Sequence, residues 1–384
     1  MWVRRAVVAT LGAGLVASGV GACSQGHTTA SPWPRLSWHG SGLPAPAGQR
    51  AVVRAATWCD GQWVVVGATA DAGSRTRPAV WVSTDARTWR TLTLHPGSDF
   101  YTAREILTSV ACSHGRLALL GAKSGGAHGM PRTATWRQRP DGSLAAVSAP
   151  YVLFGGTESV GVAGLDGGPD GYAVTGSRTS GAAIWQSRTG ASFRLYDGAP
   201  GLTSTSRIRT QANDALPFGD GWMVAGDVTE ESGRLRGVTW TGDGDGPWTR
   251  LELPGGSSVS TADRLVATPV GPDAAGLLDR GFGLWTLSHG AWRVAETFGT
   301  TDPEGTAARY VSGLAAAGGL VAATYSDGAR FRLWMGRDQP MPVEVSVDGD
   351  RTATVASHGS QVLLLTDDDR VGQAWLATVP RPTQ

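Results

Sequence analysis

Short apolar runs separated by turn-forming residues dominate the stretch 62–94 of the chain. Trp63–Ala68 is apolar and β-branched, Ala79–Ser83 is centred on Trp81, and Trp89–Leu94 alternates apolar and polar residues. Such runs predict strands, because β-branched and aromatic side chains fit a pleated surface and alternation exposes one face. With Val52–Thr57 in front, they predict a meander of four antiparallel strands over roughly fifty residues.

This four-strand unit recurs along the chain, with a tryptophan in each third strand and an apolar second strand before it. The first strands are rich in small residues such as Ala55 and Ala56, as convergence on a narrow axis requires. A fourth strand follows, most weakly marked at Leu144 and Val343. The repeat predicts an all-β fold, a seven-bladed β-propeller of four-stranded antiparallel blades. The tryptophans recur at intervals of 41 to 55 residues: Trp81, Trp136, Trp185, Trp240, Trp285, Trp334 and Trp375.

The last repeat shows only three strands, so we looked for the fourth at the other end of the chain. Trp33-Pro34-Arg35-Leu36 resembles Trp89-Arg90-Thr91-Leu92, and the stretch 33–39 is therefore expected to complete the last blade and close the ring. The alternative is that 33–39 belongs to a linker and the last blade is incomplete. The expected propeller covers 33–380, with blades at about 50–98, 104–150, 157–200, 207–255, 264–300, 309–348 and 351–380.

Charge and composition limit the possible partners. The formal net charge is +1, and the 33 basic residues, of which only Lys123 is lysine, are spread along the chain. A surface that binds nucleic acid would cluster its cations, so we expect no nucleic-acid partner. The 55 glycines and 16 tryptophans fit many short strands with tight turns and aromatic packing.

The N-terminus has the features of an export signal. Met1–Arg5 is short and basic, Ala6–Val20 is apolar, and Val20-Gly21-Ala22-Cys23 follows. This quartet resembles the lipobox of bacterial lipoprotein signal peptides. The resemblance implies removal of residues 1–22, a lipid on Cys23, a flexible tether over 23–32 and an extracytoplasmic protein anchored to the cell membrane. An ordinary secretory signal is the alternative; Arg4-Arg5 matches a twin-arginine signal poorly.

Export changes the interpretation of the other two cysteines. Cys59 and Cys112 occupy the same place in successive repeats, where the first strand turns into the second. In a propeller, equivalent points on neighbouring first strands can approach disulfide reach, and an isolated pair outside the cytoplasm is usually oxidised. We predict a Cys59–Cys112 disulfide; two buried free thiols are the alternative.

The turn Ser83–Trp89 resembles the Asp-box of sialidase-type propellers through Ser83, Asp85 and Trp89. The resemblance implies a structural turn in which Asp85 accepts backbone N–H groups and Trp89 packs beneath the hairpin. This copy lacks the glycine expected inside the box, and later copies, near Ser187 and Asp243, keep only parts of it. An Asp-box indicates the fold and says little about catalysis.

Catalytic and metal-binding motifs are missing from the sequence. Similarity to sialidases implies three arginines, a Tyr–Glu nucleophile pair and an acidic proton donor, but neither the Arg-Ile-Pro motif nor a Tyr–Glu arrangement can be identified. Hydrolase, zinc-protease and phosphate-loop motifs are absent too. We therefore expect no catalytic residue, cofactor or metal. The acidic runs at Asp243 and Asp245 and at Asp367–Asp369 could bind calcium, although such runs are more often solvated hairpin tips.

Arginine stands at or just before the first strand in six of the seven repeats, which would place these side chains around one mouth of the axial channel. One hypothesis is a ring of cations that receives an anionic ligand. The alternative is structural ion pairing, because Glu105, Asp263 and Asp350 adjoin three of the arginines. The six residues are Arg50, Arg104, Arg207, Arg264, Arg309 and Arg351.

Together these features predict a lipid-anchored binding propeller at the cell envelope, without catalytic activity. Its expected partners are the membrane, through the lipid on Cys23, and an envelope protein or an acidic glycan. A sialidase-like glycoside hydrolase is one alternative, and a structural partner in an envelope complex is another. The sequence does not determine the oligomeric state.

Overall fold

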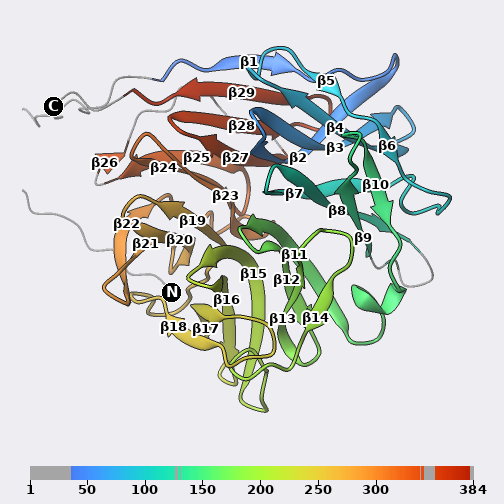
Figure 1. Ribbon diagram of the computed structural model, residues 1–384. Helices are drawn as coiled ribbons and strands as arrows, with labels where there is room; N and C mark the ends of the chain where they lie inside the picture. Colours follow the sequence, from blue (N-terminus) through green and yellow to red (C-terminus); the bar gives the residue numbers. More distant parts are fainter. Residues whose placement is uncertain (1–35, 126–128, 130, 338, 341–350, 381–384) are drawn as a thin grey trace, which may run out of the picture.

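The computed structural model describes residues 36–380 apart from 126–128, 130, 338 and 341–350. In this part of the chain, seven sheets follow one another around a common centre (Figure 1). The described residues contain one short helix, the 3₁₀ turn η1 (Tyr151–Leu153). The prediction of an all-β, seven-bladed propeller is therefore confirmed.

Two expectations from the sequence fall partly or wholly outside the described residues. The signal peptide 1–22, Cys23 and the tether 23–32 lie before residue 36. Val343, expected near the fourth strand of blade six, lies in the undescribed stretch 341–350. No helix among the described residues is long and apolar enough to cross a membrane.

Within each blade, strands that follow one another in the chain lie side by side and antiparallel, and the first strand contacts the first strands of the neighbouring blades. Blade one consists of β2 (Gln49–Cys59), β3 (Gln62–Asp71), β4 (Thr76–Ser83) and β5 (Arg90–Thr91). Blade two contains β7 (Ile106–Ser113), β8 (Arg116–Ser124), β9 (Pro131–Gln138) and β10 (Leu144–Val147). Blade three consists of β11 (Ser159–Gly168), β12 (Gly171–Arg178), β13 (Gly181–Ser187) and β14 (Arg194–Tyr196). Blade four consists of β15 (Ile208–Phe218), β16 (Gly221–Glu230), β17 (Leu235–Gly242) and β18 (Thr249–Glu252). Blade five consists of β19 (Arg264–Thr268), β20 (Gly271–Leu278), β21 (Gly281–Ser288) and β22 (Ala291–Phe298). Blade six consists of β23 (Arg309–Ala317), β24 (Leu320–Asp327), β25 (Phe331–Arg337) and β26 (Gln339–Pro340).

Blade two has a fifth strand that the sequence did not predict. The stretch 89–94 was expected to form the fourth strand of blade one, but only Arg90–Thr91 pairs with β4. The chain then crosses to blade two, where β6 (Leu94–His95) runs parallel to β10. Leu92 and Leu94 pack against the apolar cluster between the two blades, so the crossing buries both leucines.

The ring closes in blade seven, which contains β27 (Thr352–His358), β28 (Gln361–Asp367), β29 (Gly372–Thr378) and the N-terminal strand β1 (His39–Gly42). β1 pairs antiparallel with β29, with His39 opposite Leu376, and Figure 1 shows the blue and red strands side by side. A closing strand was predicted, but at 33–39. Among the described residues of that stretch, Leu36 is not part of a strand.

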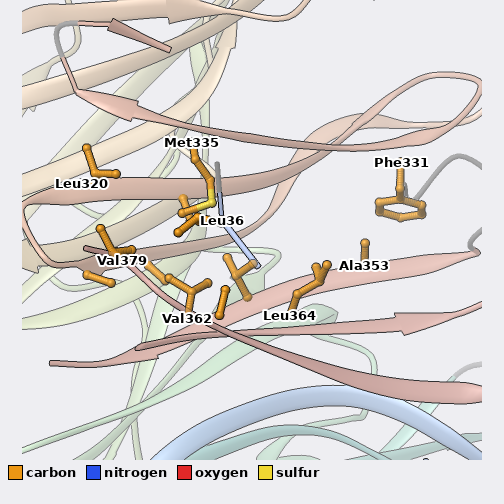
Figure 2. Packing of buried hydrophobic residues seen from close by; sticks show 13 residues of the cluster. Leu36, Leu320, Phe331, Met335, Ala353, Val362, Leu364 and Val379 are labelled. Carbon is orange, nitrogen blue, oxygen red and sulfur yellow. The ribbon is translucent and has the colours of Figure 1, made fainter. Parts of the chain in front are cut away.

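Leu36 instead anchors the chain before β1 enters the sheet. Its side chain is only 1% exposed and belongs to the apolar cluster between blades six and seven. Figure 2 shows Leu36 near Met335 of blade six and above Val362 of blade seven. The sequence similarity between Leu36 and Leu92 therefore reflects, at each position, a leucine that packs against an apolar cluster. The pairing of the N-terminal strand with β29 begins three residues after Leu36, at His39.

Cys59 and Cys112 are bonded to each other in the structure. The S–S distance is 2.02 Å and the Cα atoms lie 5.6 Å apart. Cys59 ends β2 and Cys112 lies near the end of β7, so the disulfide links the first strands of blades one and two. It closes a loop of 53 residues, which restricts the unfolded chain.

The Ser83–Trp89 turn is held by one carboxylate. Asp85 accepts hydrogen bonds from the Thr88 and Arg87 N–H groups, both at 2.9 Å, and from the Ser83 hydroxyl at 2.8 Å. These bonds, the Thr88 N–H foremost, lower the pKa of Asp85 to about 2. Ala86 occupies the left-handed region with φ 53°, where the glycine of an Asp-box would be favoured. The Trp89 indole donates to the Ser41 hydroxyl at 2.9 Å and so ties the turn to β1.

The third-strand tryptophans fasten the segments that cross from one blade to the next. Each indole N–H of blades one, three, four and five donates to a backbone carbonyl in the crossover that enters its own blade. Those tryptophan rings are fully buried, so the paired carbonyl and N–H groups have little access to other partners. The bonds are Trp81 to Pro44 at 2.8 Å, Trp185 to Leu153 at 2.8 Å, Trp240 to Gly201 at 3.0 Å and Trp285 to Pro254 at 2.8 Å.

A glycine in the second strand makes room for this arrangement in blades one to five. It stands two residues after the partner of the tryptophan, as Gly226 does after Val224, which pairs with Trp240. A Cβ on Gly226 would collide with the Gln211 carbonyl and would lie 2.8 Å from the Trp240 ring. In blades six and seven Tyr325 and Thr366 take this place, and their tryptophans are only half-buried.

Blade two uses a side chain where blades one, three, four and five use a carbonyl group. The Trp136 indole donates to Glu105, which precedes β7 and is 0% exposed. The second carboxyl oxygen of Glu105 is buried without a hydrogen-bond partner. Burial raises the pKa of Glu105 to about 8, although the Trp136 bond opposes the shift.

Replacing Trp240 by Phe should lower the free energy of unfolding by about 1–3 kcal/mol, because the variant cannot donate the indole hydrogen bond to the Gly201 carbonyl. Urea unfolding followed by circular dichroism measures the change. Trp334→Phe is the matched control, since this half-buried ring lies in the equivalent strand and stacks on Phe298. Equal losses in both variants would show that ring volume, rather than the hydrogen bond, sets the stability.

Glu105 should make the protein less stable as the pH rises from about 4.5 to 8. In that window the unfolded chain ionises this carboxyl group while the folded chain keeps it protonated, so unfolding is favoured. Glu105→Gln should therefore be more stable than the wild type at pH 8, by on the order of 2–4 kcal/mol, with a smaller difference at pH 5. Urea unfolding at both pH values tests this, with exposed Glu304→Gln as control; parallel pH profiles would contradict it.

Candidate functional site

The first strands of all blades begin on one face of the propeller, which we call the entry face. The six predicted arginines lie at or just before these strand starts, so all belong to the entry face. Their side chains, however, have different surroundings and do not form one continuous ring.

Arg50 and Arg351 are paired with carboxylates of blade seven. Arg50 lies 3.1 Å from Asp367 and 3.8 Å from Asp369, and Arg351 lies 3.7 Å from Asp369. Arg54, which the sequence did not single out, reaches the other oxygen of Asp367 at 2.9 Å. Two guanidinium groups therefore share the carboxylate of Asp367, whose side chain is 1% exposed.

Arg264 and Arg309 hold backbone carbonyl groups. Arg264 donates to the carbonyls of Ser312 at 3.2 Å and Asp263 at 2.7 Å, and so joins blades five and six at the axis. Arg309 donates to Asp302 at 2.8 Å and Gly305 at 3.2 Å in the crossover that leads into its own strand. These contacts are structural, and they occupy donors that a ligand would otherwise use.

Arg104 and Arg207 are both exposed. The Arg104 guanidinium lies 4.2 Å from the centroid of the Phe100 ring, and no carboxylate within the described residues pairs with it. Arg207 has no side-chain ion pair with any described residue either. Of the six predicted positions, only these two are exposed and have no ion pair with a carboxylate of the described residues.

The acidic neighbours that the ion-pair hypothesis named serve other groups. Glu105 bonds to Trp136 rather than Arg104, and Asp263 accepts the Val311 N–H at 2.7 Å. Asp350 lies outside the described residues. Ion pairs do hold Arg50 and Arg351, but their partners are Asp367 and Asp369, a run considered for calcium on the sequence.

Three aspartates with little exposure near the axis join consecutive blades. Asp166 accepts the Ala215 N–H at 3.2 Å, Asp214 the Leu265 N–H at 2.7 Å, and Asp263 the Val311 N–H at 2.7 Å. Burial raises the pKa of all three carboxyl groups, and in Asp214 and Asp263 the nearby Arg264 opposes the shift. Each bond runs from one blade to the first strand of the next, so these side chains fix neighbouring blades together.

A hollow of about 740 Å³ opens on the entry face between blades one and two, within the size range of small-molecule sites. Arg50, Arg54 and Lys123 line it together with Asp71 and Asp369. Arg54 was missed because it stands in a β-bulge four residues beyond Arg50, which turns it toward the same carboxylate as Arg50. Lys123 was noticed only as the single lysine of the chain.

The charges around this hollow leave a positive surplus. Asp71 pairs with Arg75 at 2.8 Å, Asp369 is shared by Arg50 and Arg351, and Asp367 is shared by Arg50 and Arg54. Lys123 has no ion pair with any residue that the structure describes. Among the described residues, the charged lining and its ion-pair partners comprise five basic side chains and three carboxylates, a surplus of two positive charges for an anion.

A partly buried tyrosine, Tyr310, also lies within the influence of the charged groups near the axis. Tyr310 lies close enough to Arg264, Asp263 and Arg54 for their charges to influence its ionisation. Burial is the dominant effect and raises the pKa of Tyr310, so the phenol stays protonated. A sialidase would need a glutamate to activate this hydroxyl group, whereas the charges of the described residues that act most on Tyr310 are those of Arg264, Asp263 and Arg54.

The acidic runs considered for calcium are engaged with protein groups. Asp243 accepts a hydrogen bond from the Gln186 amide at 2.8 Å, and Asp245 pairs with Arg194 at 2.7 Å. Within the described residues, no group of three or more His, Cys, Asp or Glu side chains is arranged to hold a metal ion.

Comparison with known proteins identifies the fold and not a family. No protein-family model matches the chain, and no curated protein matches it. The Cps50 (Swd1) β-propeller domain from Myceliophteria thermophila is 14% identical at TM-score 0.54, over 90% of this chain and 100% of that one. Virginiamycin B lyase from Staphylococcus aureus, in a catalytically inactive form with quinupristin, is 11% identical at TM-score 0.52, with the same coverage of 90% and 100%. Trypanosoma rangeli sialidase is 13% identical at TM-score 0.47, over 90% of this chain and 58% of that one. The likenesses above 0.5 show that the chain has a β-propeller fold.

Proposed function

We propose that this protein is a non-catalytic binding propeller that takes a carboxylate-bearing ligand in the entry-face hollow between blades one and two. The observation that carries this proposal is the uncompensated positive charge around Arg50, Arg54 and Lys123. An arginine pair anchored on one buried carboxylate is already ordered, so little side-chain entropy is lost when a ligand binds.

The composition of the hollow favours binding over catalysis. Its described lining contains Ser74 and Thr76 but no His, Cys, Tyr or Glu, and its two carboxylates, Asp71 and Asp369, pair with arginines rather than with either hydroxyl. Among the described residues, the charges that act most on the protonated Tyr310 at the nearby axis come from Arg264, Asp263 and Arg54, and none of these is the glutamate that a sialidase-type nucleophile needs. Both observations support a receptor for anions over a glycoside hydrolase.

The cellular setting is part of the same proposal. A lipid on Cys23 would hold the propeller outside the cytoplasm at the bacterial cell membrane, and the Cys59–Cys112 disulfide suits such an oxidising compartment. Ligands within reach would then be acidic glycans or carboxylate-rich loops of other envelope proteins. Both present the same chemical group to the hollow.

The test is calorimetric titration of the full chain with two probes, hexaglutamate for an acidic protein loop and oligogalacturonate for an acidic glycan. At low salt we expect one probe to bind, and binding to weaken as salt screens the charges. Lys123→Gln should reduce the affinity about tenfold, the effect of one charge-assisted hydrogen bond. Lys123 has no ion-pair or hydrogen-bonding side-chain partner among the described residues, so the fold should be unaffected.

Arg293→Gln is the matched control, because it removes an exposed basic residue from β22 in blade five. It should bind both probes as the wild type does. The proposal fails if neither probe binds at low salt, or if Lys123→Gln and Arg293→Gln have the same affinity as the wild type.

A further inference from the structure

A second surface on the entry face consists of aromatic side chains and arginines. It lies where the crossovers into blades two and three meet the start of β9, and we define the aromatic–arginine patch as Phe100, Tyr101, Arg104, Arg132 and Tyr151. Phe100 is 57% exposed and Tyr151 is 52% exposed. Large aromatic side chains with this exposure are costly in water, and together with arginine they are enriched at protein interfaces.

The members of the patch contact one another in a continuous chain. Phe100 and Tyr101 meet edge to face at 5.4 Å, and Arg104 lies over Phe100. Arg132 lies 4.3 Å from the Tyr101 centroid and 5.0 Å from that of Tyr151, so it bridges the two crossovers. These contacts restrict the rotamers of both arginines before any partner arrives, which lowers the entropic cost of binding.

The two arginines of the patch carry charge that the protein does not neutralise. A guanidinium group that stacks on a ring keeps its N–H donors free at the edge, and no acceptor within the described residues takes them from Arg104 or Arg132. The nearby Asp99 carboxylate accepts the N–H groups of Tyr101 at 3.0 Å and Thr102 at 2.9 Å, and Glu105 is buried. The patch is therefore positive, and it matches carboxylates.

An apolar groove of about 320 Å³ adjoins the patch and shares Tyr151 with it. Phe154, Pro131 and Val162 contribute to its lining, and Val160, which is 63% exposed, stands at its edge. The groove lies between blades two and three, whereas the hollow of the proposed function lies between blades one and two. Its size fits one or two apolar side chains of a partner.

We propose that the aromatic–arginine patch and this groove bind an acidic segment of a partner protein, with its carboxylates on Arg104 and Arg132 and an apolar side chain in the groove. This goes beyond the ligand of the hollow, because it uses other residues and requires an apolar group next to the acids. Charge complementarity selects acidic partners, and the concave groove favours a protein side chain over a flat lipid surface.

Selection from a random peptide library displayed on phage, panned on the full chain, tests this inference. We expect the selected peptides to be enriched in Asp or Glu beside Leu, Ile, Val or Phe. A synthetic copy of the most enriched peptide should bind at least tenfold more weakly to Arg132→Gln and to Tyr151→Ser. Arg293→Gln and Lys123→Gln should bind it as the wild type does, which separates this surface from the hollow.

Four results would overturn the inference: no enrichment, enrichment without acidic residues, unchanged peptide affinity in Arg132→Gln, or a loss in Lys123→Gln as large as that in Arg132→Gln. Thermal unfolding of each variant shows whether it is folded, so that a loss of peptide affinity can be assigned to the substituted side chain. If one variant does not fold, Arg104→Gln takes its place. Sedimentation with phosphatidylglycerol vesicles tests whether the patch binds a lipid surface instead of a protein. Vesicle binding that Arg132→Gln abolishes, without any peptide binding, would assign the patch to the membrane and reject a protein partner.

Discussion

The hydrogen bond between a third-strand indole and the carbonyl group of an incoming crossover sets the spacing of this propeller. A buried carbonyl group must find a donor, and the long tryptophan side chain reaches it from within the sheet. Each indole thereby fixes both the position of its own blade and the path of the chain from the previous one. The second-strand glycine is part of the same constraint, because a side chain there would displace the first strand or the ring. Blades six and seven lack that glycine, and their tryptophans are correspondingly less buried.

The centre of the molecule meets a different constraint, since first strands that converge on an axis cannot be joined by bulky apolar side chains. Asp166, Asp214 and Asp263 solve this by accepting N–H groups from the following blade. Burial raises the pKa of these carboxyl groups, and the nearby Arg264 offsets part of the cost of their charged form. A concentration of charged residues at a propeller axis can therefore be structural. Here the charge available to ligands lies away from the axis, toward blades one to three.

The architecture could be predicted from the sequence because it depends on local patterns that repeat. Strand periodicity, the Trp81-type positions and the glycine turns are all visible in a single chain. The closing strand was placed too early because Leu36 imitates Leu92 in letters, while the true pairing depends on register with β29, more than 330 residues away. The partner of Arg54 could not be found for the same reason, as Asp367 is separated from it by 313 positions. The aromatic–arginine patch is formed by residues of two crossovers whose sequences do not repeat, so the periodicity of the chain did not predict it.

The direction of β1 has a consequence for how the molecule would stand on a cell surface. β1 runs antiparallel to β29, so the chain reaches His39 at the face opposite the hollow and the patch. If Cys23 carries a lipid, the thirteen residues from there to Leu36 could span at most about 45 Å. A tether of this length would hold the propeller close to the bilayer, with the face at which the chain reaches His39 turned toward the membrane. Both recognition surfaces would then point outward, where soluble or neighbouring molecules can dock without competition from the lipid headgroups.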